Sequence, residues 1–269
     1  MIKRTTDPSP RPGAAPRIRR GYFESRHGQL HVHQAIPAGG GFEEDVPLLA
    51  LHAAPFSARM FTGLLPIMGR TRSAFAPDLP GFGASDAPAP LSIPEHAAAI
   101  GEFIATMRLR EIDVLGCGLG ALVALELAAA HPAVRRVIIV ALPMRDLAAQ
   151  PQSAETAEAY VRGAWASARA DCGSEAALAS VFAACGDRLL NGAQSPAVTT
   201  AERDYPLRER LRATRQPLLL LHSHEWLGGV HEPFQEVPAR SRRALPGTVA
   251  LFISAPQSIA VLIQDFLKA

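Results

Sequence analysis

Uninterrupted apolar runs alternate along this chain with segments of helical periodicity. The runs, of which "VPLLALH" and "RRVIIVAL" are the clearest, are rich in leucine and β-branched residues, as in strands that helices cover on both faces. An alternating segment on either side of Gly28 predicts a hairpin before them. The pattern therefore predicts an α/β fold with a mostly parallel sheet flanked by helices. The predicted strands are 46–52, 73–79, 112–116, 135–142, 216–223 and 248–254, and the predicted helices are 57–69, 93–109, 119–130, 234–245 and 258–269.

The alternation breaks between 143 and 215, where the sequence is Ala-rich, helical in pattern and interrupted by Gly and Pro. Strand and helix patterns resume at 216, so this stretch is predicted to be a helical lid inserted into a single α/β domain. Residues 1–16 are polar and Pro-rich, which predicts a disordered tail. The α/β core is therefore expected in two parts, 17–142 and 216–269.

Composition narrows the classes of function. The 27 Lys and Arg residues nearly balance the 25 Asp and Glu residues, and a net charge of +2 favours neither nucleic acid nor a membrane as partner. No apolar run approaches the ~18 residues of a spanning helix, and the first residues lack a signal-peptide pattern. The three cysteines lack metal-type spacing, which predicts reduced thiols, a cytoplasmic protein, and neither a metal nor another cofactor.

Four blocks carry a family resemblance. In chain order they are "LHAAPFSARMF", "APDLPGFGASD", "DVLGCGLGALVALELAAAHP" and "PLLLLHS", and together they resemble the α/β-hydrolase superfamily from about Gly21 onward. The resemblance implies the α/β-hydrolase fold, with a lid and a site at the carboxyl edge of the sheet. It also implies that His52 opens the loop that supplies oxyanion donors.

The third block is similar to the family's nucleophile elbow, a sharp turn between a strand and a helix. Gly116 and Gly120 match the small residues that let strand and helix approach, which puts Gly118 at the nucleophile position. The resemblance implies that the backbone N–H of Leu119 is one oxyanion donor. A second would come from Ala53 or Ala54, in the loop after the third strand.

The sequence departs from the family at all three positions of the catalytic triad. Gly118 has no side chain, and glycine adopts the strained elbow conformation freely. The expected acid falls on Trp226, with Glu225 beside it, and no His follows His231 in the chain. The family order of nucleophile, acid and His is therefore not matched, which predicts a degenerate triad.

Other side chains near these blocks have two interpretations each. Cys117 is predicted to pack in the core rather than to attack a substrate, and Ser57 to cap the helix that follows it. The segment "HSHEWLGGVHE" brings His224, Glu225 and His231 together, either as a displaced base with a carboxylate or as solvated loop residues. Its spacing matches no metal-ligand motif. Four lid aromatics either line a pocket or pack the lid against the core, namely Tyr160, Trp165, Phe182 and Tyr205.

Two functions follow, with a third held open. The first is a degenerate hydrolase that binds a small, mostly apolar molecule without efficient catalysis. The second is a non-covalent enzyme, of hydrolase, lyase or isomerase type, that uses the oxyanion donors with His224 or His231 as general base. The third is a subunit that pairs with an intact homologue, for which the sequence has no interface signature.

Overall fold

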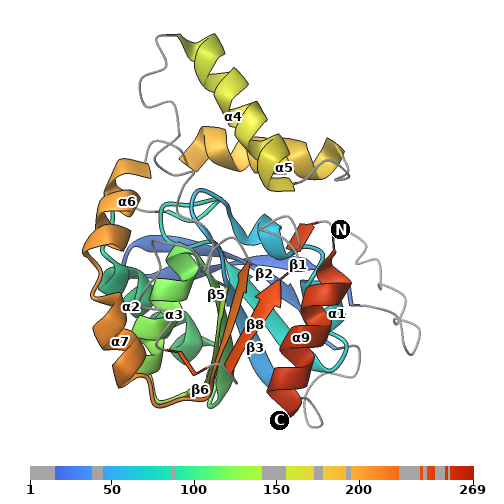
Figure 1. The fold of residues 1–269 in the computed structure, drawn as a ribbon, viewed down its shortest axis with the longest axis vertical. Helices are drawn as coiled ribbons and strands as arrows, with labels where there is room; N and C mark the ends of the chain where they lie inside the picture. The colour runs from blue at the N-terminus through green and yellow to red at the C-terminus, as the bar shows by residue number, and fades with distance from the viewer. Residues whose placement is uncertain are drawn as a thin grey trace, which may run out of the picture.

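The computed structural model describes residues 16–37, 45–86, 89–140, 156–172, 178–191, 195–223, 237–238, 241–245, 252–253 and 255–269. Within these ranges, eight strands form one sheet in the order β1-β2-β4-β3-β5-β6-β7-β8 (Figure 1). β1 and β2 form the predicted hairpin, β2 pairs antiparallel with β4, and all other neighbours are parallel. This confirms the predicted mostly parallel sheet. The strands are β1 (Arg19–Ser25), β2 (Gly28–Ala35), β3 (Asp45–Leu51), β4 (Arg72–Pro77), β5 (Ile112–Cys117), β6 (Val134–Val140), β7 (Leu218–Ser223) and β8 (Arg242–Leu245).

Helices cover the sheet on both faces, so its strands are buried on both sides. Successive residues of β3 alternate between the two cores: Leu49 and Leu51 belong to one, Leu48 and Ala50 to the other. The first core contains α2 (Ile93–Thr106) and α3 (Leu119–Ala130). The second contains α1 (Leu65–Met68) and α9 (Pro256–Lys268).

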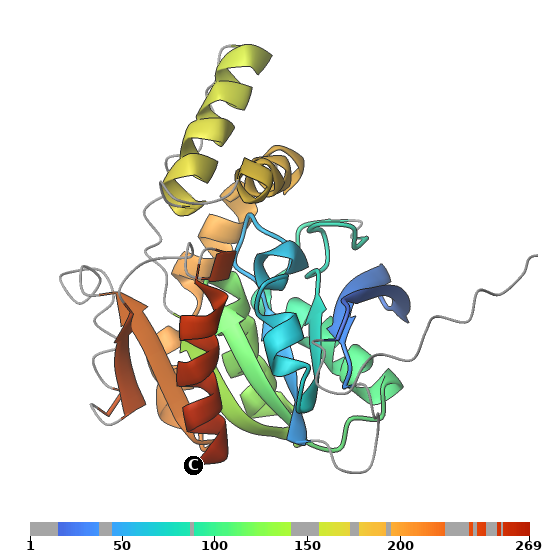
Figure 2. The ribbon, with the colours of Figure 1, turned by 90° about the vertical axis from the view of Figure 1, so that its right-hand side faces the viewer.

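Four further helices lie in the predicted lid range. α4 (Ala157–Cys172) and α5 (Leu178–Asn191) pack against each other and stand above the sheet in both ribbon views (Figures 1 and 2). α6 (Ser195–Asp204) and α7 (Leu207–Ala213) instead run beside α3. The range predicted as a lid thus contains one helical pair above the sheet and one pair beside it.

One predicted helix differs from the structure. The helix predicted at 57–69 is a 3-10 helix, η1 (Ala58–Phe61), followed by the short α1. Pro66 lies in the first turn of α1 and has no N–H to donate to the preceding turn, so one continuous helix cannot form.

The end of the sheet differs as well. Arg242–Leu245, predicted as the end of a helix, forms β8 and pairs with β7, from Leu220 opposite Arg242 to Ser223 opposite Leu245. Phe252 and Ile253, predicted as strand, are helical. Without β8, the edge of β7 would leave backbone N–H and carbonyl groups unpaired, and Arg242–Leu245 satisfies them. Local periodicity does not indicate which segment pairs with that edge.

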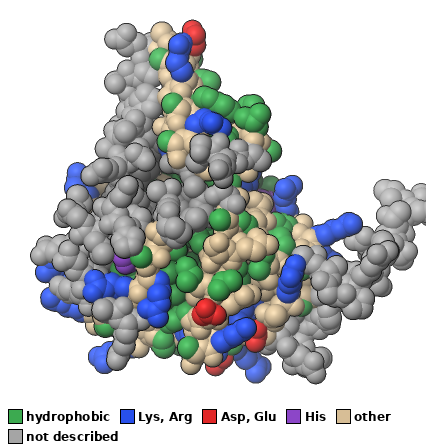
Figure 3. Space-filling model, turned by 45° about the vertical axis from the view of Figure 1, so that its right-hand side comes forward, with side chains coloured by type: hydrophobic (Ala, Val, Ile, Leu, Met, Phe, Trp, Pro, Cys, Tyr) green, Lys and Arg blue, Asp and Glu red, His purple; other side chains and the backbone are tan. Residues whose placement is uncertain are grey.

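Hydrophobic side chains reach the surface on the lid helices. In Figure 3 they show near the top of the molecule, over α4 and α5. On the face that Figure 3 shows, Lys and Arg side chains lie at several separate places instead of forming one patch. No helix in the described ranges is long and apolar enough to cross a bilayer. The large exposed hydrophobic side chains of α4 and α5 are Val161, Leu178, Phe182 and Leu190.

Candidate active-site region at the strand–helix elbow

A sharp turn joins β5 to α3, and Gly118 occupies its apex with φ +50° and ψ −119°. Such a positive φ favours glycine, because a Cβ would crowd the following backbone. The Gly118 N–H donates to the Val140 carbonyl, 3.3 Å away, and the Gly120 N–H donates to the His52 carbonyl at 3.1 Å. The turn is therefore held between the ends of β6 and β3.

The two flanking glycines allow strand and helix to approach closely. A Cβ on Gly116 would overlap the backbone of Gly120 and Ala121, and a Cβ on Gly120 would overlap the Leu51 carbonyl. This is the packing expected at an elbow. The backbone geometry of that turn is thus present, with a hydrogen where its apex side chain would be.

His52 has a structural role in the loop after β3. Its Nδ1 lies 3.0 Å from the Ala53 carbonyl oxygen, and its Nε2 accepts the Leu79 N–H at 2.9 Å. Since Nε2 accepts, Nδ1 carries the proton and donates to Ala53. Complete burial lowers the pKa of His52, which favours this neutral form. Both ring nitrogens are therefore occupied within the fold.

The residues predicted as oxyanion donors lie on neighbouring segments beside Gly118. Leu119 is the first residue of α3, so its N–H has no intrahelical acceptor. The bond from Gly120 to His52 holds the loop of Ala53 and Ala54 next to this helix start, and both alanines are buried. The structure thus brings the sequence-predicted donors to one place, and their roles as oxyanion donors stay predictions.

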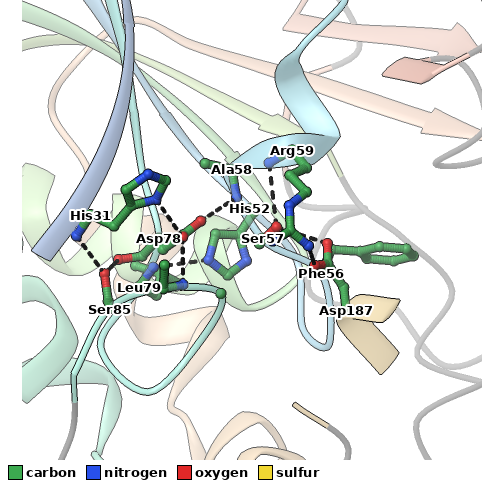
Figure 4. Close-up of polar contacts among 12 residues, drawn as sticks. His31, His52, Phe56, Ser57, Ala58, Arg59, Asp78, Leu79, Ser85 and Asp187 are labelled. Carbon is green, nitrogen blue, oxygen red and sulfur yellow. Dashed lines mark hydrogen bonds and ion pairs between the residues drawn. The ribbon is translucent and has the colours of Figure 1, made fainter. Parts of the chain in front are cut away.

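A buried carboxylate, missed in the sequence, fixes the loops around the elbow (Figure 4). Asp78 follows β4 and accepts hydrogen bonds from the Ala58 N–H at 2.6 Å and the Ala84 N–H at 2.9 Å. His31 Nδ1 lies 2.9 Å from its Oδ2. Burial opposes the charge, but these bonds hold the pKa of Asp78 below its ordinary value. At Gly83, where φ is +58°, a Cβ would overlap this carboxylate.

A second buried carboxylate reaches the same loop from α5. Asp187 accepts from Ser57 Oγ at 2.7 Å and from Arg59 Nη1 at 2.6 Å (Figure 4). Burial raises the pKa of Asp187 to about 6, even though both of these donors favour the charged form. Ser57 also accepts the Arg59 N–H at the start of η1, which confirms its predicted capping role.

Asn191, at the end of α5, joins two loops. Its Nδ2 donates to the Pro55 carbonyl at 2.8 Å, and its Oδ1 accepts the Gly83 N–H at 3.2 Å. Both atoms lie in a side chain that is buried. Through Asp187 and Asn191, α5 therefore contacts the loop after β3 and the loop after β4 with polar groups, although the sequence indicates only a helix.

Several sequence candidates have other outcomes. Cys117 is fully buried in the α1 and α9 core, as predicted, and burial raises the pKa of its thiol well above the ordinary value. Within the described ranges, no group of three or more His, Cys, Asp or Glu residues is suited to a metal ion. His224, Glu225, Trp226 and His231 lie outside the described residues.

The lid aromatics pack against protein. The Trp165 and Phe182 rings lie 5.2 Å apart, and Phe182 is largely exposed. The Tyr160 hydroxyl donates to the Arg188 carbonyl, which joins α4 to α5. Tyr205 Oη donates to Glu126 Oε2 at 3.0 Å and thereby joins the end of α6 to α3. Pocket contact by these side chains stays a prediction.

Comparison with known proteins gives a family and a fold. The Alpha/beta hydrolase family profile matches residues 48–260. No curated protein sequence matches the chain. Among solved structures, a mutant of the N-acyl homoserine lactonase AidH complexed with N-hexanoyl homoserine has a TM-score of 0.75 and 19% identity, over 93% of this chain and 96% of that one.

Two other solved structures match over nearly the whole chain. A serine-to-glycine mutant of AidH, complexed with N-hexanoyl homoserine lactone, has a TM-score of 0.72 and 20% identity over 93% of this chain and 98% of that one. A variant of AqdC in complex with its substrate, the Pseudomonas quinolone signal whose ring it cleaves, has a TM-score of 0.72 and 20% identity over 93% and 99%. At these identities the likeness establishes the fold.

Proposed function

The chain belongs to the alpha/beta hydrolase family, and from that premise we propose that it binds a small, mostly apolar molecule beside Gly118 without forming a covalent intermediate. The glycine at the apex of the elbow carries this proposal, because covalent catalysis on this fold begins with a side chain at that place. Here the apex carries only hydrogen.

The missing base supports the same proposal. Triad chemistry needs a His to take the proton of the nucleophile, and in the family order this His comes last. The last His in this sequence is His231, and no His follows β8. Loss of the whole triad leaves about 10³–10⁴ of rate over water, or roughly 4–5.5 kcal/mol of barrier lowering. Such a remnant does not make an efficient esterase.

Other nucleophiles near the elbow are occupied or inaccessible. The Cys117 thiol is fully buried, and its raised pKa keeps it protonated. Ser57 Oγ donates its proton to Asp187 and is itself buried. The Asp187 carboxylate beside Ser57 is also bonded to Arg59, so this buried network fixes η1 against α5 rather than activating an accessible nucleophile.

The donors that stay beside Gly118 suit a carbonyl ligand. The Leu119 N–H points from the start of α3, where the helix dipole favours a partial negative charge. The AidH comparison supports this use of the site, since the serine-to-glycine mutant is complexed with N-hexanoyl homoserine lactone, whose ring is intact. Apolar molecules with a lactone or amide carbonyl are therefore the class of ligand to test first.

The retained donors also favour a second candidate, a non-covalent enzyme. The space above Gly118 would admit a water or a substrate, and the N–H groups of Leu119 and of Ala53 or Ala54 would stabilise an enolate or oxyanion formed there, with His224 or His231 as general base. Replacement of each His by Ala is the test. Turnover that survives in both variants contradicts this second candidate.

The decisive experiment combines covalent trapping with binding. The purified protein is incubated with a fluorophosphonate probe and, separately, with N-hexanoyl homoserine lactone, and a serine hydrolase serves as the positive control. Intact-mass spectrometry is expected to show no adduct, while NMR shows saturable binding of a lactone that stays closed. A covalent adduct contradicts the proposal, and lactone opening without an adduct favours the non-covalent enzyme.

A further inference from the structure

Glu202 is a buried carboxyl group without a partner. It lies on α6, its side chain is 7% exposed, and its Oε2 has no hydrogen-bond partner in the described structure. Buried carboxyl groups are almost always hydrogen-bonded or paired with a cation, because desolvation is otherwise uncompensated. An isolated buried carboxyl is therefore a candidate for contact with a ligand.

Glu202 faces the elbow helix. Val198 and Ala201 of α6, and Tyr205 directly after it, pack in the same core as Leu119 and Leu122 of α3. Glu202 follows Val198 by four positions within α6, so the two side chains lie on the same helical face. The side chain is thus directed into the interface between α6 and α3.

The height of Glu202 along α3 follows from the contacts of its neighbours. The Tyr205 hydroxyl donates to the Leu122 carbonyl at 3.3 Å, and further along, Gln216 Nε2 donates to the Ala128 carbonyl at 2.8 Å. The segment from α6 to β7 therefore runs alongside α3 in the same direction, as Figure 1 shows for α6 and α7. One turn before Tyr205, Glu202 is level with the first turn of α3, which begins directly after Gly118.

Glu126, in the same interface, has partners for both carboxylate oxygens. Its Oε2 accepts from Tyr205, and its Oε1 lies 3.2 Å from Arg210 Nη2. Glu202 has no such cation, and burial alone raises its pKa to about 7. Near neutral pH its carboxyl group can therefore donate or accept a hydrogen bond.

We infer that Glu202 binds the polar group of the ligand at this site. Together with the Leu119 N–H, it selects a carbonyl compound that carries an amide N–H or a hydroxyl next to the carbonyl. The carbonyl oxygen accepts from Leu119, and the neighbouring donor binds the Glu202 carboxylate. This inference rests on the proposed ligand-binding function and adds the chemistry that the ligand needs.

The test compares two probes that differ in one group. N-hexanoyl homoserine lactone has an amide N–H, and 3-hexanoyloxy-γ-butyrolactone has an ester oxygen in its place. Isothermal titration measures both with the full chain and with Glu202→Gln, Glu202→Met and the control Glu209→Gln, which changes an exposed carboxylate on α7.

The wild type and the control are expected to bind the amide about tenfold more tightly than the ester, since one buried acceptor is satisfied only by the amide. Glu202→Met loses this preference, and Glu202→Gln, which keeps an acceptor oxygen, retains part of it. Equal binding of both probes by the wild type, binding of neither, or a preference that survives in Glu202→Met overturns the inference.

A ligand-free measurement tests the same claim. If Glu202 has no partner inside the protein, Glu202→Met removes an uncompensated carboxylate, and its melting temperature at pH 8 exceeds that of the wild type. A lower melting temperature shows an internal partner and overturns the inference. An adduct with the fluorophosphonate probe, in contrast, contradicts the proposed function and leaves this measurement unaffected.

Discussion

Two properties of Gly118 determine the proposed site: its backbone has a positive φ of 50°, and it has no side chain. Its place between β5 and α3 is set by hydrogen bonds to Val140 and by the close packing of Gly116 and Gly120. The elbow therefore keeps its shape through backbone contacts and does not need a side chain at its apex.

Restoring the hydroxyl tests this at the residue scale. Gly118→Ser is expected to lower the free energy of unfolding by ~1–3 kcal/mol, because a residue with a Cβ is strained at this φ. Hydrolysis of p-nitrophenyl hexanoate should not rise above the rate of the wild type, since the variant still lacks the last His of the triad. Chemical denaturation and a spectrophotometric assay measure the two effects. Rapid hydrolysis by the variant would show that a base is present after all.

Asp187 gives a pH dependence that can be isolated by one substitution. Its pKa of about 6 in the folded protein exceeds the ordinary value of 3.8, so the folded state holds the proton more tightly. Its contribution to stability is therefore complete below pH ~4 and is lost as the pH rises through about 6, a change on the order of 3 kcal/mol. Asp187→Asn removes this titration.

The measurement is urea denaturation of both proteins from pH 4 to pH 7. The stability of the Asn variant relative to the wild type should rise across this range. Because His33 and His96 titrate near pH 4 in both proteins, only the difference between the two curves reports on Asp187. Parallel curves would contradict the raised pKa.

At the scale of elements, α5 connects the lid to the loops that flank the elbow. Asn191 bonds Pro55 in one loop and Gly83 in the other, and Asp187 bonds Ser57 and Arg59. These contacts are polar and buried, unlike the exposed apolar residues on the other side of the lid helices. The stability of the loop of residues 52–57 should therefore depend on α5.

Asn191→Ala tests this dependence by hydrogen exchange. Loss of two buried hydrogen bonds, at ~1 kcal/mol each, predicts amide exchange roughly tenfold faster or more, both in α5 and in the loop of residues 52–57. The control Glu158→Gln removes only an exposed i,i+4 ion pair on α4 and should leave exchange unchanged. Faster exchange in α5 alone would mean that the loop is held without the lid.

At the scale of the whole molecule, a buried ion cluster ties the amino end of the sheet together. Asp113, at the start of β5, is fully buried and lies 3.0 Å from Arg135 Nη2 and 3.4 Å from Arg72 Nη1. Arg72 is itself buried and belongs to β4. The cluster joins three strands at the edge opposite the elbow, so it supports the fold rather than the site.

Asp113→Ala should lower the free energy of unfolding by up to about 3–5 kcal/mol, because it removes the buried carboxylate of the cluster and leaves Arg72, among the described residues, only the half-exposed Asp45 as an acidic partner. Ligand affinity of the protein that stays folded is expected not to change. Denaturation and titration measure the two quantities. Asp204→Asn, which breaks an exposed pair with Arg203, is the matched control and should behave as wild type.

Most of the fold is readable from local pattern because its strands are buried on both faces. The apolar run 135–142 and the helical pattern of 119–130 are long and regular in sequence. The corresponding elements, β6 and α3, lie close to these predicted bounds. β8 is not readable in this way. A short edge strand has a weak pattern, and the free edge of β7 decides which segment pairs with it.

The site is readable only in part. Gly118 follows from the order of motifs, whereas Asp78, Asp187 and Asn191 act through partners far away in sequence. One feature of the sequence points to Glu202: it is a carboxylate four residues after Val198, on the apolar face of a helix. Periodicity marks such a residue as unusual, but it does not say whether a partner is near.

The sequence by itself determined the alternation of strands and helices, the glycine at the elbow and the lack of a His after His231, since each depends on local residue types and their order. Only the tertiary structure decided that α5 contacts the loop of residues 52–57, that both nitrogens of His52 are occupied and that Glu202 is buried without a partner among the described residues. Those properties depend on distances between segments and on desolvation, and both arise when the chain packs.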